Sequence, residues 1–250
     1  YTGLFKSLSA VNLRPGEYGL LYKIGDVDKG DRYRGDHGKE GDDTVRKPCY
    51  SDPGWWDKMK EEVTRILNEG NDLYYGVKDY SLGDECFLGS NVCFSEWCLK
   101  DFREYLKKQY KDLNELNKTW STDFGRWEEV LPIQLKEVKK DKNNMAAWLD
   151  HKMFMTTVFA RIGERMKDIV EEATPGMEAQ IGFSGMQNPR YSYNWWELMK
   201  YMTSLQHYGG MQKDLIRSFR LPGTRYGLWV GYAGEDSDAE KYSRYHVWRG

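Results

Sequence analysis

This sequence of 250 residues has few cysteines, no marked excess of either charge sign and no long apolar runs. Four cysteines are too few for a disulfide scaffold and do not define the redox compartment. A net charge of -2 gives no electrostatic reason to expect a nucleic acid or an anionic membrane as partner. No apolar run reaches the roughly 20 residues that span a bilayer. We therefore expect a protein that binds neither nucleic acids nor membranes.

Several common signatures are also missing. The sequence has no Gly-x-Ser-x-Gly elbow, no P-loop, no glycine-rich dinucleotide fingerprint and no His-Glu-x-x-His pair. The segment Gly182-Phe183-Ser184-Gly185 is not an elbow, because its second glycine comes one residue too early. No signal-peptide pattern is present either, but both ends, Tyr1 and Gly250, look cut. The location of the protein therefore stays open between the cytoplasm and secretion.

Aromatic residues are what the sequence has in abundance, with 10 Trp and 18 Tyr, and hydrophobic residues make up 40% of the chain. That content is sufficient for a large core. Aromatic rings pack such cores and can also stack on sugar rings, and core packing is the default role for most of them. No linker rich in Pro, Gly or Ser divides the chain. We therefore predict one domain over residues 1–250.

Short apolar runs alternate with long amphipathic ones, which is typical of an α/β fold built on a parallel sheet. The predicted strands are residues 17–24, 73–77, 179–183, 204–208 and 226–232, with a polar loop over 25–47 and a segment 80–85 that follows the second strand. The predicted helices are residues 53–69, 96–110, 145–173 and 211–219. About five strand–helix units result, whereas a TIM-type (β/α)8 barrel needs eight. An incomplete barrel is therefore predicted.

Glu85 is the first candidate for chemistry. In parallel α/β folds, functional residues gather at the carboxyl ends of strands, and Glu85 lies at such an end in Leu82-Gly83-Asp84-Glu85-Cys86. Apolar surroundings there would raise its pKa, as a general acid near neutral pH requires. Asp84 would face another side and could orient a substrate hydroxyl. The alternative is that both are solvated loop carboxylates.

The chain from Val45 to Phe219 resembles glycoside hydrolase family 42, the β-galactosidases with a TIM-barrel catalytic domain. The most specific similarity is a helix with cysteines at its start, followed by a Leu-Asn-x-x-Trp element that ends at Trp120. Weaker similarities are the family's basic segment, its Asn-Glu pair and the start of its next long helix. The corresponding segments here are residues 45–53, 83–85, 93–120 and 148–150.

This resemblance implies a retaining glycosidase that cleaves a β-linked galactoside or a related oligosaccharide. The chain would contain about the third to the seventh strand of its barrel. It implies no cofactor for catalysis, and relatives that often form homo-oligomers. Retaining enzymes use two carboxyl groups about 5–5.5 Å apart, one as acid/base and one as nucleophile. Glu85 matches the acid/base. The family's nucleophile is a Glu near the position of Tyr232, but residues 229–234 contain no carboxylate. Glu235 is therefore the predicted nucleophile, if the strand end is bulged or shifted. The alternatives are Asp236, a missing nucleophile, or a relative of the family that places its nucleophile elsewhere.

The resemblance also implies substrate-binding positions. Asp84 stands where the family has an Asn that donates to a sugar hydroxyl, and an ionised Asp can only accept. It would also raise the pKa of Glu85 by like-charge repulsion. The other predicted contacts are Arg46, His207, Tyr208 and Trp229. A solvated loop role for Arg46, a hydrogen-bonded strand-end role for His207 and core packing for Trp229 are the alternatives.

In many family members four cysteines hold a zinc ion, and three of the cysteines here match. Cys93 and Cys98 match the outer pair of a Cys-x-Cys-x-x-Cys cluster, Ser95 replaces the middle one, and Cys49 matches the distant one. Cys86 could supply a fourth ligand, since structural zinc prefers four thiolate or imidazole ligands. Such a zinc would be structural rather than catalytic. Buried free thiols or a Cys93–Cys98 disulfide are the alternatives.

Two other functional classes compete with the hydrolase. The first is a non-catalytic carbohydrate-binding barrel, which the lack of a carboxylate near Tyr232 favours. The second is a structural or assembly domain without a sugar site, which burial of both His207 and Trp229 would favour.

Overall fold

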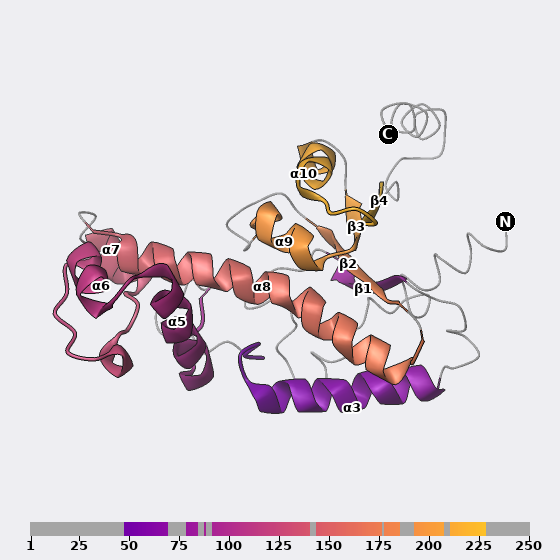
Figure 1. Cartoon of the computed structure of the whole chain (residues 1–250), viewed down its shortest axis with the longest axis horizontal. Helices are drawn as coiled ribbons and strands as arrows, with labels where there is room; N and C mark the ends of the chain where they lie inside the picture. The colour runs from indigo at the N-terminus through magenta and orange to yellow at the C-terminus, as the bar shows by residue number, and fades with distance from the viewer. Residues whose placement is uncertain are drawn as a thin grey trace.

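The computed structural model describes most of the chain between Pro48 and Leu228 (Figure 1). The described residues are 48–69, 79–84, 88, 92–140, 144–176, 178–185, 193–207 and 211–228. The predicted strands over 17–24 and 73–77 and the predicted loop over 25–47 lie outside these residues.

The described part alternates helices with parallel strands. The strands are β1 (Asp79–Asp84), β2 (Gln180–Gly185), β3 (Ser204–His207) and β4 (Arg225–Leu228). The helices are α3 (Pro53–Glu69), α5 (Glu96–Gln109), α6 (Leu113–Trp120), α7 (Leu135–Lys140), α8 (Ala146–Ala173), α9 (Trp195–Tyr201) and α10 (Met211–Phe219), with a 3-10 turn η1 (Trp127–Glu129). The predicted helices α3, α8 and α10 are confirmed to within one residue at either end.

The sheet has the strand order β1-β2-β3-β4, and every neighbouring pair is parallel. One helix at least separates each strand from the next, and α8 packs on β2 while α9 contacts both α8 and α10. Strand order therefore follows chain order without a reversal in the described part. That order is typical of a (β/α) barrel and differs from a doubly wound sheet, whose strand order reverses at a switch point.

Two sequence predictions differ from the structure. Residues 80–85 were expected to follow a strand, but Asp79–Asp84 is itself the strand β1, so Asp84 ends it. The helix starting at Glu96 was expected to carry Leu113 on its apolar face. Instead it ends at Gln109, and Leu113 begins α6 because the Asp112 side chain accepts a hydrogen bond from the Glu115 N–H and caps a new helix.

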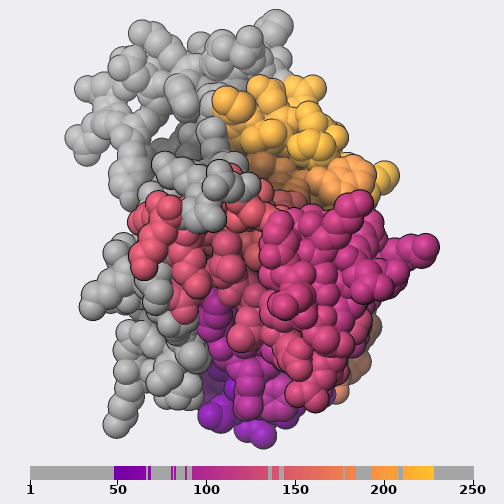
Figure 2. All heavy atoms as spheres, turned by 90° about the vertical axis from the view of Figure 1, so that its left-hand side faces the viewer, coloured from indigo at the N-terminus to yellow at the C-terminus, as the bar shows by residue number. Residues whose placement is uncertain are grey.

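Residues 92–140, which we call the helical subdomain, lie between β1 and α8 in the sequence and pack on the amino-terminal half of α8. Phe102 is 0% exposed, and its ring lies 5.3 Å from that of Phe154 on α8 and 6.2 Å from that of Trp120 on α6. Figure 2 shows this subdomain, in magenta, as a continuous surface on the face turned toward the viewer. Its core is thus aromatic and shared with α8.

The centre of the sheet depends on a glycine. Gly182 of β2 pairs with Ser204 of β3. A Cβ atom at Gly182 would lie 1.0 Å from the Ser204 carbonyl oxygen. The two strands can therefore approach only because residue 182 has no side chain.

Candidate functional site

The carboxyl edge of the sheet is the first candidate site. Because all described strands are parallel, Asp84, Gly185, His207 and Leu228 end them at the same edge. In the sequence, Glu85, Tyr208 and Trp229 come directly after β1, β3 and β4. Parallel α/β proteins collect their functional residues at this edge of the sheet, and the roles of these three residues there stay predictions.

Most predicted site residues themselves lie outside the described part of the chain. These are Arg46, Glu85, Tyr208, Trp229 and Glu235, together with Cys86 and Asp236. Their roles therefore remain predictions. For Asp84 the structure describes the backbone, as the last residue of β1.

The end of β1 is irregular. Ser81 pairs with Gly182, but Asp84 pairs with Ser184, so β1 uses one more residue than β2 over the same stretch. Such a bulge bends the strand and re-aims the residues that follow, and bulges are over-represented beside active sites. The bulge or shift near Tyr232 that the assignment of Glu235 requires lies outside the described residues, so the irregularity of β1 does not test it.

His207 ends β3 and is only 3% exposed. Its ring centroid lies 6.2 Å from that of Tyr226 on β4, in a tilted arrangement. Its burial agrees with the predicted alternative of a packed strand-end residue. The structural-domain hypothesis required burial of Trp229 as well, and Trp229 lies outside the described residues.

The cysteines form the second candidate site. The side-chain sulfurs of Cys49, Cys93 and Cys98 all lie within 4.8 Å of one another. Cys49 comes from the turn before α3, Cys93 from the segment before α5, and Cys98 from the first turn of α5. All three are free thiols, so the alternative of a Cys93–Cys98 disulfide is not what the structure contains. The tertiary fold thus joins residues that are 44 positions apart in sequence.

The spacing of these sulfurs suits a tetrahedral metal. Cys93 Sγ lies 3.9 Å from Cys49 Sγ. Two thiolates on one tetrahedral zinc, at about 2.3 Å each, would be about 3.8 Å apart. Ser95 Oγ lies 2.9 Å from Cys49 Sγ and 3.4 Å from Cys93 Sγ. Three thiols and one hydroxyl therefore approximate a zinc site with one weak ligand.

Ser95 also has a structural role. Its side chain accepts a hydrogen bond from the Cys98 N–H at 3.1 Å and caps the amino terminus of α5. That bond gives Ser95 a role in the fold that does not depend on a metal. It also holds the turn that carries Cys93 against the helix that carries Cys98.

The thiols influence one another's ionisation. The hydrogen bonds with Cys49 and Cys93, followed by burial, raise the pKa of the Cys98 thiol well above its ordinary value. The hydrogen bond with Cys93 is the largest cause that raises the pKa of Cys49. Thiols this close disfavour each other's negative charge, whereas a divalent cation between them would favour the thiolates.

Two residues on α8 that support this cluster were not predicted from the sequence. His151 is 0% exposed, and its Nε2 lies 3.2 Å from the Cys93 carbonyl oxygen. Met155, one turn later, places its sulfur 3.8 Å from Cys98 Sγ. Their four-residue spacing on an apolar helix face was visible in the sequence, but it is equally typical of core packing.

A polar network ties the helical subdomain to α8 and was also missed. Asp150 accepts hydrogen bonds from the Tyr110 hydroxyl at 2.5 Å and from Trp120 Nε1 at 2.8 Å. Burial and the bond with Asp150 raise the pKa of Tyr110 to about 12. The network therefore joins α6, the end of α5 and the start of α8 through one carboxylate.

Among the described residues, no helix is both long and apolar enough to cross a membrane.

Comparison with known proteins covers most of the chain. The family model described as beta-galactosidase, glycoside hydrolase 42, matches residues 32–218. That span contains every segment on which the resemblance was based. It also contains β1, β2, β3 and the whole helical subdomain.

Curated relatives are beta-galactosidases. The BgaB enzyme of Geobacillus kaustophilus is 26% identical over 176 residues, which cover 64% of this chain and 25% of the relative. The LacZ enzyme of Heyndrickxia coagulans is 30% identical over 152 residues, which cover 58% of this chain and 22% of the relative. The chain thus spans about a quarter of the length of the curated relatives it matches.

Solved structures agree on the fold. The beta-galactosidase of Bacillus circulans sp. alkalophilus superposes with a TM-score of 0.52 at 19% identity, covering 65% of this chain and 24% of that chain. The beta-galactosidase of Marinomonas ef1 superposes with a TM-score of 0.51 at 16% identity, covering 67% and 26%. At such identities the likeness concerns the fold alone. Together with the match of the family model, these observations show that the chain belongs to glycoside hydrolase family 42.

Proposed function

We propose that this chain supplies part of the catalytic barrel of a retaining glycosidase that cleaves a β-linked galactoside or a related oligosaccharide. The observation that carries the proposal is the parallel sheet whose carboxyl edge ends in Asp84 and His207, with Glu85 next in the sequence. Membership of a family described as beta-galactosidase supports the substrate class. The ascending strand order supports a TIM-type barrel, seen from about its third strand to its seventh.

The proposed chemistry is a double displacement. Glu85 protonates the leaving glycosidic oxygen while a second carboxylate, provisionally Glu235, attacks the anomeric carbon and forms a glycosyl ester. Glu85, now ionised, removes a proton from water, and the resulting hydroxide breaks that ester and releases the sugar. Asp84 accepts a hydrogen bond from a substrate hydroxyl, and Arg46, Tyr208 and Trp229 contact the sugar. His207 supports the strand end from inside the core.

Replacing Glu85 tests the proposal directly. Glu85→Gln in the native full-length protein should lower turnover of an aryl β-galactoside by about 10²- to 10⁴-fold, because the amide cannot transfer the proton. Glu178→Gln is the matched control, since Glu178 is exposed and precedes β2 at the opposite, amino edge of the sheet. Turnover unchanged by Glu85→Gln would rule out the proposed acid/base.

A second variant separates hydrolysis from binding alone. Glu235→Gln should abolish covalent labelling by a fluorosugar, because no carboxylate remains to form the ester. If the unmodified protein binds galactosides but neither hydrolyses nor becomes labelled, the alternative function holds. That alternative is a carbohydrate-binding barrel without its nucleophile, and the absence of a carboxylate from residues 229–234 favours it.

We also propose that Cys49, Cys93 and Cys98 hold a structural zinc, with Ser95 beside a weak fourth position. The 3.9 Å separation of the Cys49 and Cys93 sulfurs supports this assignment. Zinc bound there would link the turn before α3 to the start of α5. Metal analysis of the purified protein should find one zinc per chain, and Cys93→Ser should remove it. Zinc retained at full occupancy in that variant would contradict the proposal.

A further inference from the structure

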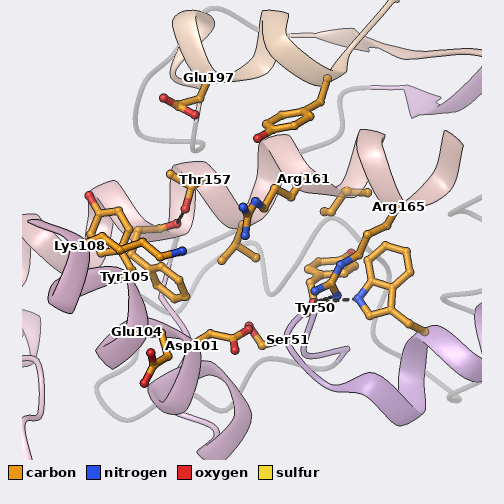
Figure 3. Close-up of a pocket in the computed structure, with 15 residues that line it drawn as sticks. Tyr50, Ser51, Asp101, Glu104, Tyr105, Lys108, Thr157, Arg161, Arg165 and Glu197 are labelled. Atoms are coloured by element: carbon orange, nitrogen blue, oxygen red, sulfur yellow. Dashed lines mark hydrogen bonds between the residues drawn. The ribbon is translucent and has the colours of Figure 1, made fainter. Parts of the chain in front are cut away.

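A cavity of about 280 Å³ lies beside the middle of α8, away from the strands. Its described lining comes from α5, α8, α9, the start of α3 and the turn before α3 (Figure 3). No described strand contributes a residue to it. The cavity is therefore a separate feature from the carboxyl edge of the sheet, and nothing in the proposed function uses it.

Several polar side chains in this cavity make no hydrogen bond or ion pair within the described part of the chain. Ser51 is only 9% exposed, yet its hydroxyl lines the cavity without a partner. Asp101, Lys108 and Arg161 also line it without an ion pair. Figure 3 shows Arg161 extending from α8 toward the middle of the cavity, with Asp101 and Ser51 across from it. Ser51 is buried and Asp101 is half-buried, and polar groups in such places normally have partners, whereas Arg161 and Lys108 are exposed and are solvated when no ligand is bound.

Other charged groups of the lining are already paired. Glu104 accepts a hydrogen bond from Lys107, and Glu197 accepts one from Lys200, both at 2.7 Å. Arg165 donates to the Tyr50 carbonyl at 3.0 Å and lies over the Trp56 ring at 5.0 Å.

The lining as a whole carries no net charge. It contains the acids Asp101, Glu104 and Glu197 and the bases Lys108, Arg161 and Arg165. A cavity with balanced charge gives neither an anion nor a cation a net attraction. It suits a neutral ligand with several groups that both donate and accept hydrogen bonds.

Aromatic rings complete the lining. Tyr50, Trp56, Tyr105, Phe154 and Tyr201 all contribute to it. Arg165 covers the Trp56 ring, which leaves the tyrosine and phenylalanine side chains as the aromatic candidates for the C–H face of a pyranose. Carboxylate, guanidinium and hydroxyl groups suit the rim of hydroxyls of such a sugar. The volume is slightly below the usual range for sites of drug-sized ligands, about 300–1,000 Å³, and so fits a small ligand.

From these observations we infer that the cavity is a second saccharide-binding site, which takes a neutral sugar of one or two rings on the helical side of the fold. Arg161 and Asp101 hold the sugar hydroxyls from opposite walls, and Ser51 contributes a hydrogen bond at the base of the cavity. The inference depends on the lining alone, so it stands or falls independently of Glu85.

The test uses ligand-observed saturation-transfer NMR on the native full-length protein, with galactose, glucose and xylose as probes that cannot be hydrolysed. Arg161→Ala and Asp101→Ala should each weaken binding of at least one sugar about tenfold or more, because each removes a charge-assisted hydrogen bond. Among the described residues, neither side chain has an ion-pair partner to lose. Glu164→Ala, an exposed carboxylate on α8 that does not line the cavity, is the control and should leave the affinity unchanged.

Two further variants make the outcome decisive. Ser51→Val, which replaces the hydroxyl without changing charge, should also weaken the sugar, and circular dichroism checks that each variant is folded. Glu85→Gln should leave sugar binding in the cavity unchanged. The experiment therefore distinguishes a failure of the catalytic proposal from a failure of the cavity proposal. Equal sugar affinity in the unmodified protein and all cavity variants overturns the inference. So does tighter binding of inorganic phosphate than of any sugar, if Arg161→Ala abolishes it, because the cavity would then be an anion site.

Discussion

The carboxyl edge of the sheet and the helical subdomain are held together in different ways. At the sheet, strands approach through backbone contacts that leave no room for a side chain at Gly182, and β1 is bulged before Asp84. In the subdomain, each of α5 and α6 begins with a capping side chain, and aromatic rings and one carboxylate join them to α8. The sheet therefore depends on the shape of its backbone, whereas the subdomain depends on its side chains.

This difference matters for function. The bulge in β1 re-aims the residues that follow it. Binding residues commonly lie in loops at such strand ends, where the sheet positions them. The subdomain, in contrast, brings Cys49, Cys93 and Cys98 together and forms one wall of the cavity near Arg161. Under the proposed function, the sheet edge carries the chemistry and the helical subdomain supports the fold beside it.

The largest effect should come from adding a single methyl group to the sheet. Gly182→Ala should lower the free energy of unfolding by more than about 3 kcal/mol, because its Cβ would overlap the Ser204 carbonyl and no rotamer can relieve a backbone clash. Gly227→Ala in β4 is the control, since nothing lies within 4 Å of the added atom. Denaturant unfolding measures both. Equal losses in the two variants would mean that the close approach of β2 and β3 is not what limits the sheet.

In the helical subdomain, the matching change removes a side chain. Asp150→Ala should cost about 1–3 kcal/mol, because Trp120 is 4% exposed and would lose the acceptor for its indole N–H. Asp150→Asn keeps an acceptor oxygen and should cost less. Asp168→Ala, an exposed carboxylate on the same helix, should change little. A cost for Asp150→Ala no larger than that for Asp168→Ala would show that the network contributes no stability.

A smaller effect separates the two roles of Ser95. Ser95→Ala should cost about 1 kcal/mol, since it removes the cap of α5. Asp112→Ala, which removes the cap of α6, should cost a similar amount and leave zinc binding unchanged. Ser95→Cys should instead strengthen zinc binding, because a fourth thiolate completes the tetrahedral set. Competition with a chromogenic chelator measures this, and an unchanged zinc affinity in Ser95→Cys would place the fourth ligand elsewhere.

The smallest effect concerns pH. Because folding raises the pKa of Tyr110 from 10 to about 12, the folded state keeps a proton that the unfolded state loses in that range. The contribution is therefore present below pH 10 and lost as pH rises toward about 12. Tyr110→Phe should make the fall in unfolding free energy shallower in this window. Identical slopes with and without the phenol would contradict the assigned contact with Asp150.

Much of the fold could be predicted from local patterns. The apolar spacing from Met145 onward and the stop at Pro175-Gly176 predict α8, and the Asp52-Pro53 pair predicts the start of α3, where the Asp52 side chain accepts from the Gly54 N–H at 2.8 Å. Such signals act within a few residues along the chain, so they can be recognised in the sequence without tertiary information. The β1 strand was misplaced because Ser81 and Gly83 interrupt its apolar pattern, and pairing with β2 outweighs that weak propensity.

For the candidate sites too, the sequence predicted some features and the tertiary structure decided the others. The sequence by itself determined the family and the parallel α/β pattern, because these depend on residue order and periodicity. Only the tertiary structure decided that Cys49 meets Cys93 and Cys98, that Asp150 joins Tyr110 to Trp120, and that Ser51 faces Arg161 across a cavity. Those partners are tens of residues apart, and no local pattern records which helix faces will pack together.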